Sequence, residues 1–197
     1  MLLLKTSALW TVTRPCVEEA DIARYRLGYE QGGIYHDNDV TFVVPPEQWP
    51  SRYPHLPWSK ATLVVGIEFP DTGQVGIHVF AAAPNSGILK RAYRRALKNR
   101  KMGILKDPVQ ATGPFMFSQV LREVVGPAYD PQKVENSGGM AYNATLTKDC
   151  VIILPYRAFG IHPSHSHNKL PSSQVLVKHK FNGSWRGKQA RKRCVEA

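Results

Sequence analysis

The chain has 197 residues, of which 43% are hydrophobic, and its 26 Lys and Arg residues against 15 Asp and Glu leave a formal charge of +11. This length and composition exclude an intrinsically disordered protein and favour one domain with a hydrophobic core. The charge suits a polyanionic partner, such as a nucleic acid, an anionic membrane surface or a phosphorylated ligand. No apolar run approaches the ~20 residues needed to cross a bilayer, so we expect no membrane anchor in this chain.

The first predicted element is a helix over residues 18–31, where apolar residues recur at helical spacing and a pair of glycines follows. Ile34 and Tyr35 come directly after the glycines and favour a short strand. The sequence HDND that follows is therefore expected at the end of this strand or in the turn beyond it. Residues 43–60 are rich in proline and aromatic residues, which predicts an ordered but irregular surface loop.

Strands and helices alternate in the rest of the chain. Short apolar runs predict strands over residues 63–69, 77–82, 151–154 and 175–177, the first two being joined by a polar, glycine-containing connection. Amphipathic periodicity predicts surface helices over residues 86–98 and 115–125. The polar face of the first of these helices carries Lys90, Arg91, Arg94, Arg95 and Lys98. Interleaved strands and helices indicate the α/β class.

The polar residues with the clearest chemistry lie in residues 20–39, ADIARYRLGYEQGGIYHDND. Asp21 and Arg24 are three residues apart, so they share one face of the predicted helix. Asp37 and Asp39 follow the predicted strand, and carboxylate oxygens are ligands that Mn²⁺ and Mg²⁺ accept while bridging to phosphates. Because Arg24 adds fixed donors for phosphate or sugar hydroxyls, the segment suits a sugar diphosphate held through a divalent cation.

This segment resembles the block A/S-D-x-x-R-Y-x-x-L-Y-x-x-G-G-I-Y-x-D-x-D of glycosyltransferases with a DXD sugar-binding region. The similarity is to glycosyltransferase family 32, most closely to its fungal initiation-specific α-1,6-mannosyltransferases. It continues in order through VVGIE at 64–68, AAPNSGIL at 82–89, TGP at 112–114 and VKHKFNGSW at 177–185. One departure is Gly28, where the family usually carries a bulkier apolar residue.

The resemblance implies an α/β domain of the GT-A type over residues 1–185, followed by a basic tail over residues 186–197. Family members carry a longer strand-helix-strand unit before the block, so the N-terminal part of the Rossmann-like half is expected to be missing from this chain. A metal-dependent hexosyltransferase is the expected enzyme, with Mn²⁺ or Mg²⁺ as its cofactor.

The resemblance also implies a role for individual residues. Asp39 is expected to bind the metal directly, Asp37 to face the ribose or the metal, and His179 to complete the metal site. Asp21 and Arg24 are expected to hold the hydroxyls of the transferred sugar in a pocket that Tyr35 lines. Ser184 and Trp185 resemble the C-terminal residues that close over the diphosphate.

The expected reaction moves a hexose, most closely mannose from GDP-mannose, onto a glycan hydroxyl with retention of configuration. The sequence offers no firm candidate for a covalent nucleophile, so catalysis is expected to be largely electrostatic. By the same resemblance, the expected location is the Golgi lumen or another part of the secretory pathway.

Two other classes of function remain open. A truncated, inactive relative that acts as a binding or partner subunit fits the short start of the chain, and a donor hydrolysis assay with Mn²⁺ separates it from an active enzyme. A nucleic-acid-binding protein is favoured by the charge of residues 90–106 and of the tail. It lacks a recognisable binding motif, so we expect no nucleic-acid partner.

Cysteines and histidines give weaker indications. Cys16, Cys150 and Cys194 have no spacing typical of a structural zinc site and allow at most one internal disulfide. The sequence IHPSHSH at 161–167 holds three histidines in a Pro/Ser-rich setting, which favours a loop over a second metal site.

Overall fold

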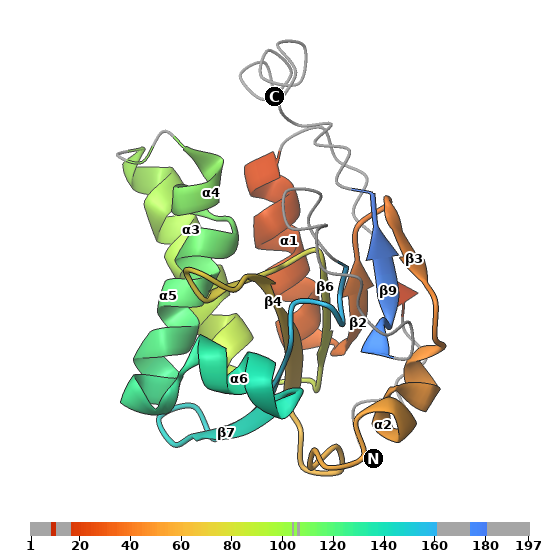
Figure 1. The fold of residues 1–197 in the computed structure, drawn as a ribbon. Helices are drawn as coiled ribbons and strands as arrows, with labels where there is room; N and C mark the ends of the chain where they lie inside the picture. Colours follow the sequence, from red (N-terminus) through yellow and green to blue (C-terminus); the bar gives the residue numbers. More distant parts are fainter. Residues whose placement is uncertain (1–8, 11–16, 104, 106, 161–173, 181–197) are drawn as a thin grey trace.

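The computed structural model describes residues 9–10, 17–103, 105, 107–160 and 174–180 (Figure 1). The helices are α1 (Val17–Glu30), α2 (Trp49–Arg52), α3 (Gly87–Met102), α4 (Pro108–Ala111), α5 (Pro114–Val125) and α6 (Pro131–Ser137). The strands are β1 (Leu9–Trp10), β2 (Gly33–His36), β3 (Val40–Phe42), β4 (Leu63–Phe69), β5 (Gln74–Val75), β6 (Val79–Ala82), β7 (Met140–Ala144), β8 (Asp149–Leu154) and β9 (Val177–His179).

A mixed sheet runs through the centre in the order β1-β2-β6-β4-β8-β7, and β5 pairs with β4 as a short antiparallel addition. The pairs β1–β2 and β4–β8 are parallel, whereas β2–β6, β6–β4 and β8–β7 are antiparallel. β3 and β9 form a separate antiparallel ribbon. The predicted α/β class is therefore confirmed.

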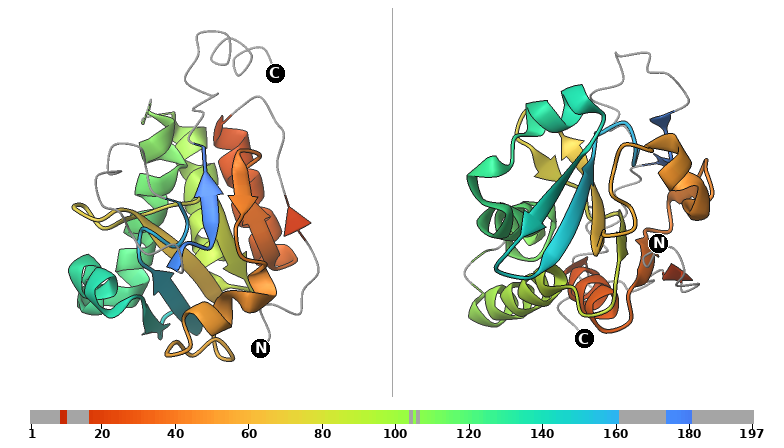
Figure 2. Two further views of the ribbon diagram at one scale, coloured as in Figure 1. Left: turned by 45° about the vertical axis from the view of Figure 1, so that its right-hand side comes forward. Right: turned by 90° about the horizontal axis from the view of Figure 1, so that it is seen from below.

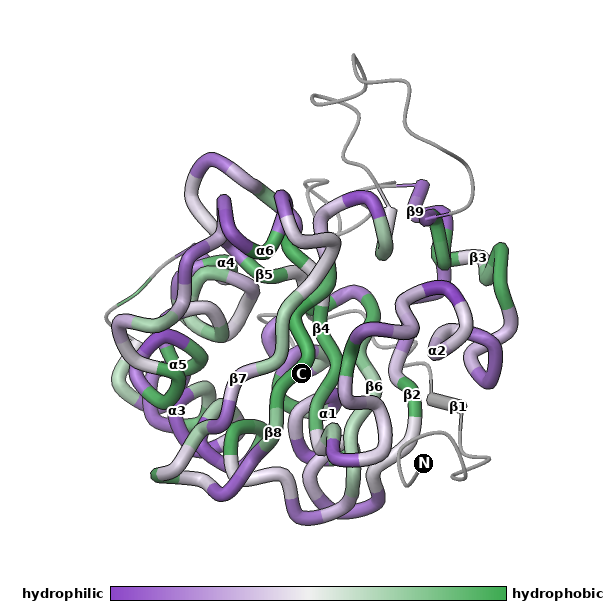
Figure 3. The backbone as a smooth tube through the Cα atoms, turned by 60° about the horizontal axis from the view of Figure 1, so that its bottom comes forward, coloured by the Kyte–Doolittle hydropathy of each residue, from purple (hydrophilic) through white to green (hydrophobic). Residues whose placement is uncertain are grey.

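Both faces of the central sheet are buried, and side chains alternate between them. Figure 3 shows the hydrophobic residues of β4 and β8 as continuous green stretches in the centre of the molecule. On β4, Leu63 and Val65 face the helical layer of α1, α3 and α5, whereas Val64 faces the opposite side. The same alternation separates Ile153 from Ile152 on β8. Because successive side chains of a strand point to opposite faces, strands covered on both sides read as continuous apolar runs, which is how the sequence presents them.

The second face is covered by the segment between β3 and β4 together with the β3–β9 ribbon, on the side opposite α1 and α3 (Figure 2). Trp49 is fully buried and Tyr53 is 2% exposed. The prediction of an irregular surface loop over residues 43–60 is therefore wrong in part. The segment is irregular as predicted, because its prolines allow only two short helices, Pro46–Gln48 and α2. Its aromatic side chains, however, are part of the hydrophobic core.

The packing of α1 accounts for the departure at Gly28. A Cβ atom there would lie 2.7 Å from Cδ1 of Leu89 on α3 and 2.8 Å from Cε2 of Phe80 on β6. Both neighbours are buried to 1% exposure or less, so a larger residue at this position would have to displace core side chains. Gly28 thus lets α1 approach α3 and the sheet closely.

Most predicted elements agree with the structure to within a few residues, including α3, whose start is capped by Ser86 accepting from Leu89 N at 3.4 Å. Three differences stand out. The connection after β4 contains β5, the last described strand is Val177–His179 rather than 175–177, and β3 and β7 were not predicted. β3 is too short for a periodicity to register, and β7 alternates only weakly.

Candidate metal and sugar-nucleotide site

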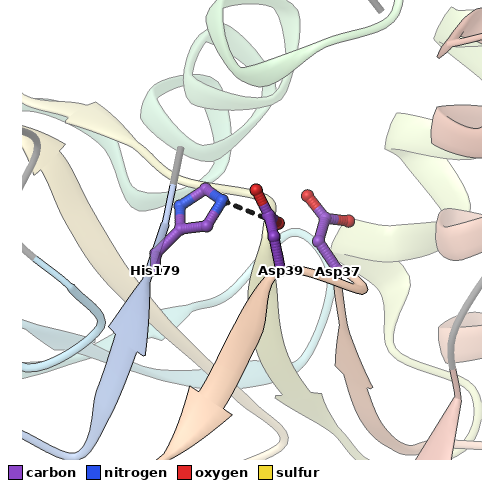
Figure 4. A group of neighbouring side chains, drawn as sticks. All are labelled: Asp37, Asp39 and His179. Atoms are coloured by element: carbon purple, nitrogen blue, oxygen red, sulfur yellow. Dashed lines mark hydrogen bonds and ion pairs between the residues drawn. The ribbon is translucent and has the colours of Figure 1, made fainter. Parts of the chain in front are cut away.

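Three ligand-type side chains from distant parts of the chain meet at one point (Figure 4). Asp37 follows β2, Asp39 precedes β3, and His179 ends β9, where it pairs in register with Val40. One ligand atom from each residue lies within 4.8 Å of the other two. The Nε2 atom of His179 is 3.1 Å from Oδ1 of Asp39, across a separation of 140 residues.

Backbone hydrogen bonds fix the turn that carries the two aspartates. Asp37 N donates to the carbonyl of His78 at 2.8 Å, and Val40 N donates back to the carbonyl of Asp37 at 3.1 Å. On the other side, Lys180 N donates to the carbonyl of Asp39 at 3.0 Å. Both carboxylates are therefore held between the central sheet and the β3–β9 ribbon, and their positions depend on both.

A buried ion-pair network lies directly behind Asp37. The guanidinium of Arg24 is 3.2 Å from Oδ1 of Asp21 and 3.2 Å from Oδ1 of Asp37, and it donates to the carbonyl of Ile77 at 2.8 Å. Asp21 is 2% exposed and Arg24 6% exposed. Arg24 thus balances two carboxylates at once, which is the arrangement in which a buried charge is tolerated.

Tyr35 joins this network from β2. Its hydroxyl donates to Oδ1 of Asp37 at 2.6 Å, and the Arg24 guanidinium lies over its ring, 4.6 Å from the centroid. Burial raises the pKa of Tyr35 well above its usual value, so the hydroxyl remains a donor at any physiological pH. Two groups, Tyr35 and Arg24, therefore orient one oxygen of Asp37.

Three residues outside the predicted set complete the surroundings. The hydroxyl of Thr112, between α4 and α5, donates to Oδ2 of Asp21 at 2.8 Å, and the Tyr25 hydroxyl donates to the carbonyl of Thr112 at 2.9 Å. The ring of His78 stacks on His179 with centroids 4.3 Å apart, and its Nε2 lies 2.7 Å from the carbonyl of Phe159. His78 could have been noticed in the sequence, because it is a single histidine within the apolar run IHVFAA. No local sequence pattern predicts that Thr112 contacts Asp21.

The setting of His179 keeps its imidazole neutral. Burial, and next the neighbouring His78, lower the pKa of His179 to about 4, although Asp39 acts in the opposite direction. Gly160 makes room for this histidine, because a Cβ atom at Gly160 would lie 2.9 Å from Cβ of His179 and its φ of 97° is one that side chains disfavour. A neutral imidazole is the form that coordinates metals.

The donor set fits a divalent cation. The side chains of Asp37, Asp39 and His179 are 29%, 19% and 9% exposed, so each reaches the surface. Ligand atoms on opposite sides of an ion with bonds of about 2.1 Å lie about 4.2 Å apart. The three ligand atoms lie within 4.8 Å of one another, so side-chain shifts of a few tenths of an ångström bring them within bonding distance of one ion. Two carboxylates and one neutral imidazole suit Mn²⁺ or Mg²⁺, with remaining positions for phosphate oxygens and water.

Replacing His179 with Ala is expected to lower the affinity for Mn²⁺ by roughly 10–100-fold, because one of three protein ligands is lost. The fold is expected to persist, since this side chain lies at the end of a short ribbon. Titration with Mn²⁺, followed by calorimetry, measures the change. His55→Ala is the matched control because His55 is exposed and lies outside the cluster. An unchanged affinity in His179→Ala would remove His179 from the metal site.

The buried carboxyl of Asp21 predicts a pH-dependent stability. Burial raises its pKa from 3.8 to about 6, against the lowering effects of Arg24 and the Thr112 hydroxyl. The folded protein therefore holds this proton more tightly than the unfolded chain does. The stabilisation is complete below pH 3.8 and is lost as the pH rises through about 6.

The free energy of unfolding of the wild type, minus that of Asp21→Asn, is accordingly expected to fall between pH 4 and 6 and to level off above that range. Urea denaturation at a series of pH values measures this difference. A difference that rises over the same range would show that the Arg24 contact outweighs burial.

The structure thus brings together six of the predicted site residues: Asp21, Arg24, Tyr35, Asp37, Asp39 and His179. Asp21 contacts Arg24, and Arg24 contacts Asp37, so the Asp21 carboxylate faces the site and not bulk solvent. Ser184, Trp185, the basic tail and the histidines of residues 161–167 lie outside the described residues. Cys150 is a half-buried free thiol, and the other two cysteines also lie outside the described part.

Comparisons with known proteins show which family this chain resembles. Residues 5–56 match a family model described as the glycosyltransferase sugar-binding region containing the DXD motif. The chain is 30% identical over 193 residues to the initiation-specific alpha-1,6-mannosyltransferase of Schizosaccharomyces pombe, an alignment that covers 86% of this chain and 47% of the relative. The predicted resemblance to DXD-containing glycosyltransferases is therefore confirmed. This chain spans about half the length of that relative.

Among solved structures, the PaToxG glycosyltransferase has a TM-score of 0.45 at 22% identity, over 61% of this chain and 42% of the other. Enzymes of the DXD family typically use a divalent metal, and the Asp37, Asp39 and His179 cluster is a possible site for one in this chain.

Proposed function

We propose that this chain, a relative of the DXD-containing glycosyltransferases, is itself a metal-dependent glycosyltransferase that binds a nucleotide sugar at Asp37 and Asp39. The observation that carries the proposal is the meeting of these two carboxylates with His179 in one cluster, backed by the ion pairs of Arg24. An acidic pair on a loop is usually only solvated. Here it is oriented by buried partners and joined by a neutral imidazole 140 residues away.

The donor is proposed to be GDP-mannose, and the product an α-linked mannose on a glycan hydroxyl, formed with retention of configuration. Support comes from the 30% identical relative, whose name specifies an α-1,6-mannosyltransferase. The family resemblance is the ground for proposing a place in the secretory pathway. None of the helices in the described part of the chain is long and apolar enough to span a bilayer.

A divalent cation, proposed to be Mn²⁺, would be held by Asp37, Asp39 and His179 and would supply positive charge to the departing diphosphate. The protein's own part is to hold these ligands in place. Tyr35 and Arg24 orient one oxygen of Asp37, and Lys180 N holds the backbone of Asp39 by donating to its carbonyl. Such preorganisation means that the ligands need not rearrange as negative charge grows on the leaving group.

The burial of Asp21 and Arg24 refines their proposed role. The oxygens of Asp21 contact Thr112 and Arg24, and Arg24 also contacts Asp37 and a backbone carbonyl. We propose that the pair sets the position of Asp37 and the wall of the sugar pocket, and that any direct contact with the sugar is made through Arg24, whose guanidinium has five donors.

Calorimetric titration with GDP-mannose, other nucleotide sugars and GDP alone, each with and without Mn²⁺, tests the proposal. Binding of one nucleotide sugar that requires Mn²⁺, together with its hydrolysis or transfer, is the expected result. Equal binding with and without metal would contradict the proposed site. Metal-dependent binding without hydrolysis or transfer to any acceptor would favour the inactive partner subunit instead.

A further inference from the structure

Exposed apolar side chains gather at one end of the helical layer. Six large hydrophobic side chains are exposed in the described part of the chain. Four of them lie between residues 97 and 115: Leu97 (41% exposed) and Met102 (52%) on α3, Leu105 (38%) in the connection from α3 to α4, and Phe115 (42%) on α5. The end of α3 and the start of α5 lie together beside α4 (Figure 1), where Asn99 of α3 donates to the carbonyl of Ala111 at 2.8 Å. The segments that carry these four side chains thus lie near one another.

The same region is strongly basic. The sequence of α3, GILKRAYRRALKNRKM, contains seven Lys or Arg residues and no acidic residue. At 100° per residue, Arg94, Leu97, Lys98, Lys101 and Met102 project from one side of the helix, and all five are exposed. We call these five residues the α3 outer face.

Two other arginines of α3 are paired with acidic residues of the protein itself. Arg95 makes a two-pronged ion pair with Glu123 of α5 at 2.6 and 2.7 Å, and Arg100 bonds Glu19 of α1 at 3.0 Å. Among described residues, Arg94, Lys98 and Lys101 make no ion pair. The nearest acidic residue in sequence, Asp107, caps α4 by accepting from Val109 N at 3.1 Å. The α3 outer face therefore carries like charges that an external anionic surface would neutralise.

The mixture of cations and exposed apolar side chains on this face fits a lipid surface better than a nucleic acid. A nucleic-acid backbone is neutralised by Lys and Arg alone, and its groove and base contacts use polar or aromatic side chains from a recognised motif. Leu97 and Met102, flanked by Lys98 and Lys101, instead match an interfacial surface, in which apolar side chains enter the acyl boundary while cations bind headgroups. The stems of the lysines add apolar area to the same face.

We propose that the α3 outer face docks the protein onto an anionic lipid surface. Leu97 and Met102 enter the interface, and Arg94, Lys98 and Lys101 contact lipid phosphates. The proposal is independent of sugar transfer, because none of these residues belongs to the cluster of Asp37, Asp39 and His179.

Co-sedimentation of the full chain with phosphatidylcholine vesicles, with and without phosphatidylserine, tests docking. We expect binding only to the phosphatidylserine vesicles. The double variant Lys98→Glu/Lys101→Glu should weaken it by about 25-fold or more, since each cation near an anionic bilayer contributes close to a fivefold factor. Leu97→Ser/Met102→Ser should also weaken it several-fold while leaving the charge unchanged.

Matched controls separate the surface from total charge and total hydrophobicity. Lys60→Glu/Lys133→Glu makes the same change in charge at exposed positions on other elements, and Leu146→Ser removes an apolar side chain that is 68% exposed on the β7–β8 turn. Both should bind vesicles like the wild type. Equal binding to neutral vesicles, or loss of binding in the controls to the same extent, would overturn the proposal. A parallel titration with an oligonucleotide tests the alternative partner. If Leu97→Ser/Met102→Ser keeps full vesicle binding and Lys98→Glu/Lys101→Glu loses oligonucleotide binding, the proposal is overturned, because the surface then binds nucleic acid.

Discussion

Asp39→Asn is expected to reduce metal-dependent sugar transfer by at least about 100-fold, because it removes one of the two carboxylates that the described residues bring to the site. Asparagine has nearly the same shape as aspartate. Its amide oxygen can still accept from Nε2 of His179, which lies 3.1 Å from the present carboxylate, so the β3–β9 ribbon should remain intact. The loss should therefore appear in metal binding and turnover and not in the melting temperature.

Asp71→Asn provides the matched control, because Asp71 is exposed in the turn after β4 and lies outside the cluster. Steady-state rates at several Mn²⁺ concentrations compare the two variants with the wild type. If Asp39→Asn has normal activity at every Mn²⁺ concentration, Asp39 is not a ligand. If its activity recovers only at high Mn²⁺, the carboxylate acts through metal affinity alone.

Arg24→Met is expected to destabilise the fold by roughly 3–5 kcal/mol, because it leaves buried Asp21 without its countercharge. For a chain of this size the melting temperature should fall by roughly 10 °C. Asp37 would also lose one of the two groups that orient it, so the variant should bind Mn²⁺ more weakly even at temperatures where it stays folded. Thermal and urea denaturation measure the first effect, and calorimetry at low temperature measures the second.

The double variant Asp21→Asn/Arg24→Met isolates the cause. Neutralising Asp21 removes the stranded charge, so the double variant should be more stable than Arg24→Met alone. Arg26→Met is the control on the same helix: Arg26 pairs with Glu30 at 2.9 Å on the exposed side, and its loss should change stability little. If Arg24→Met and Arg26→Met proved equally stable, the network behind Asp37 would contribute nothing measurable to the fold.

The sequence determined the local elements and the residue types of the candidate site. Apolar runs located β4 and β8, and helical periodicity located α1, α3 and α5. Asp37 and Asp39 were expected at the end of a strand or in the turn beyond it, and they lie directly after β2 and in the turn before β3. These features follow from interactions between residues close in sequence, which set the side-chain period of each element. The family resemblance added His179, which no local pattern would have selected.

Only the tertiary structure decided how these parts meet. The antiparallel pairing of β3 with β9 brings His179 to Asp39, the packing of α1 on the sheet brings Arg24 to the carbonyl of Ile77 and to Asp37, and the turn before α5 supplies Thr112 to Asp21. The aromatic residues of the segment after β3 became core because they found the second face of the sheet, not because of their spacing. Each of these contacts joins residues far apart in the chain, so its free energy depends on the packed fold and leaves no periodic trace in the sequence.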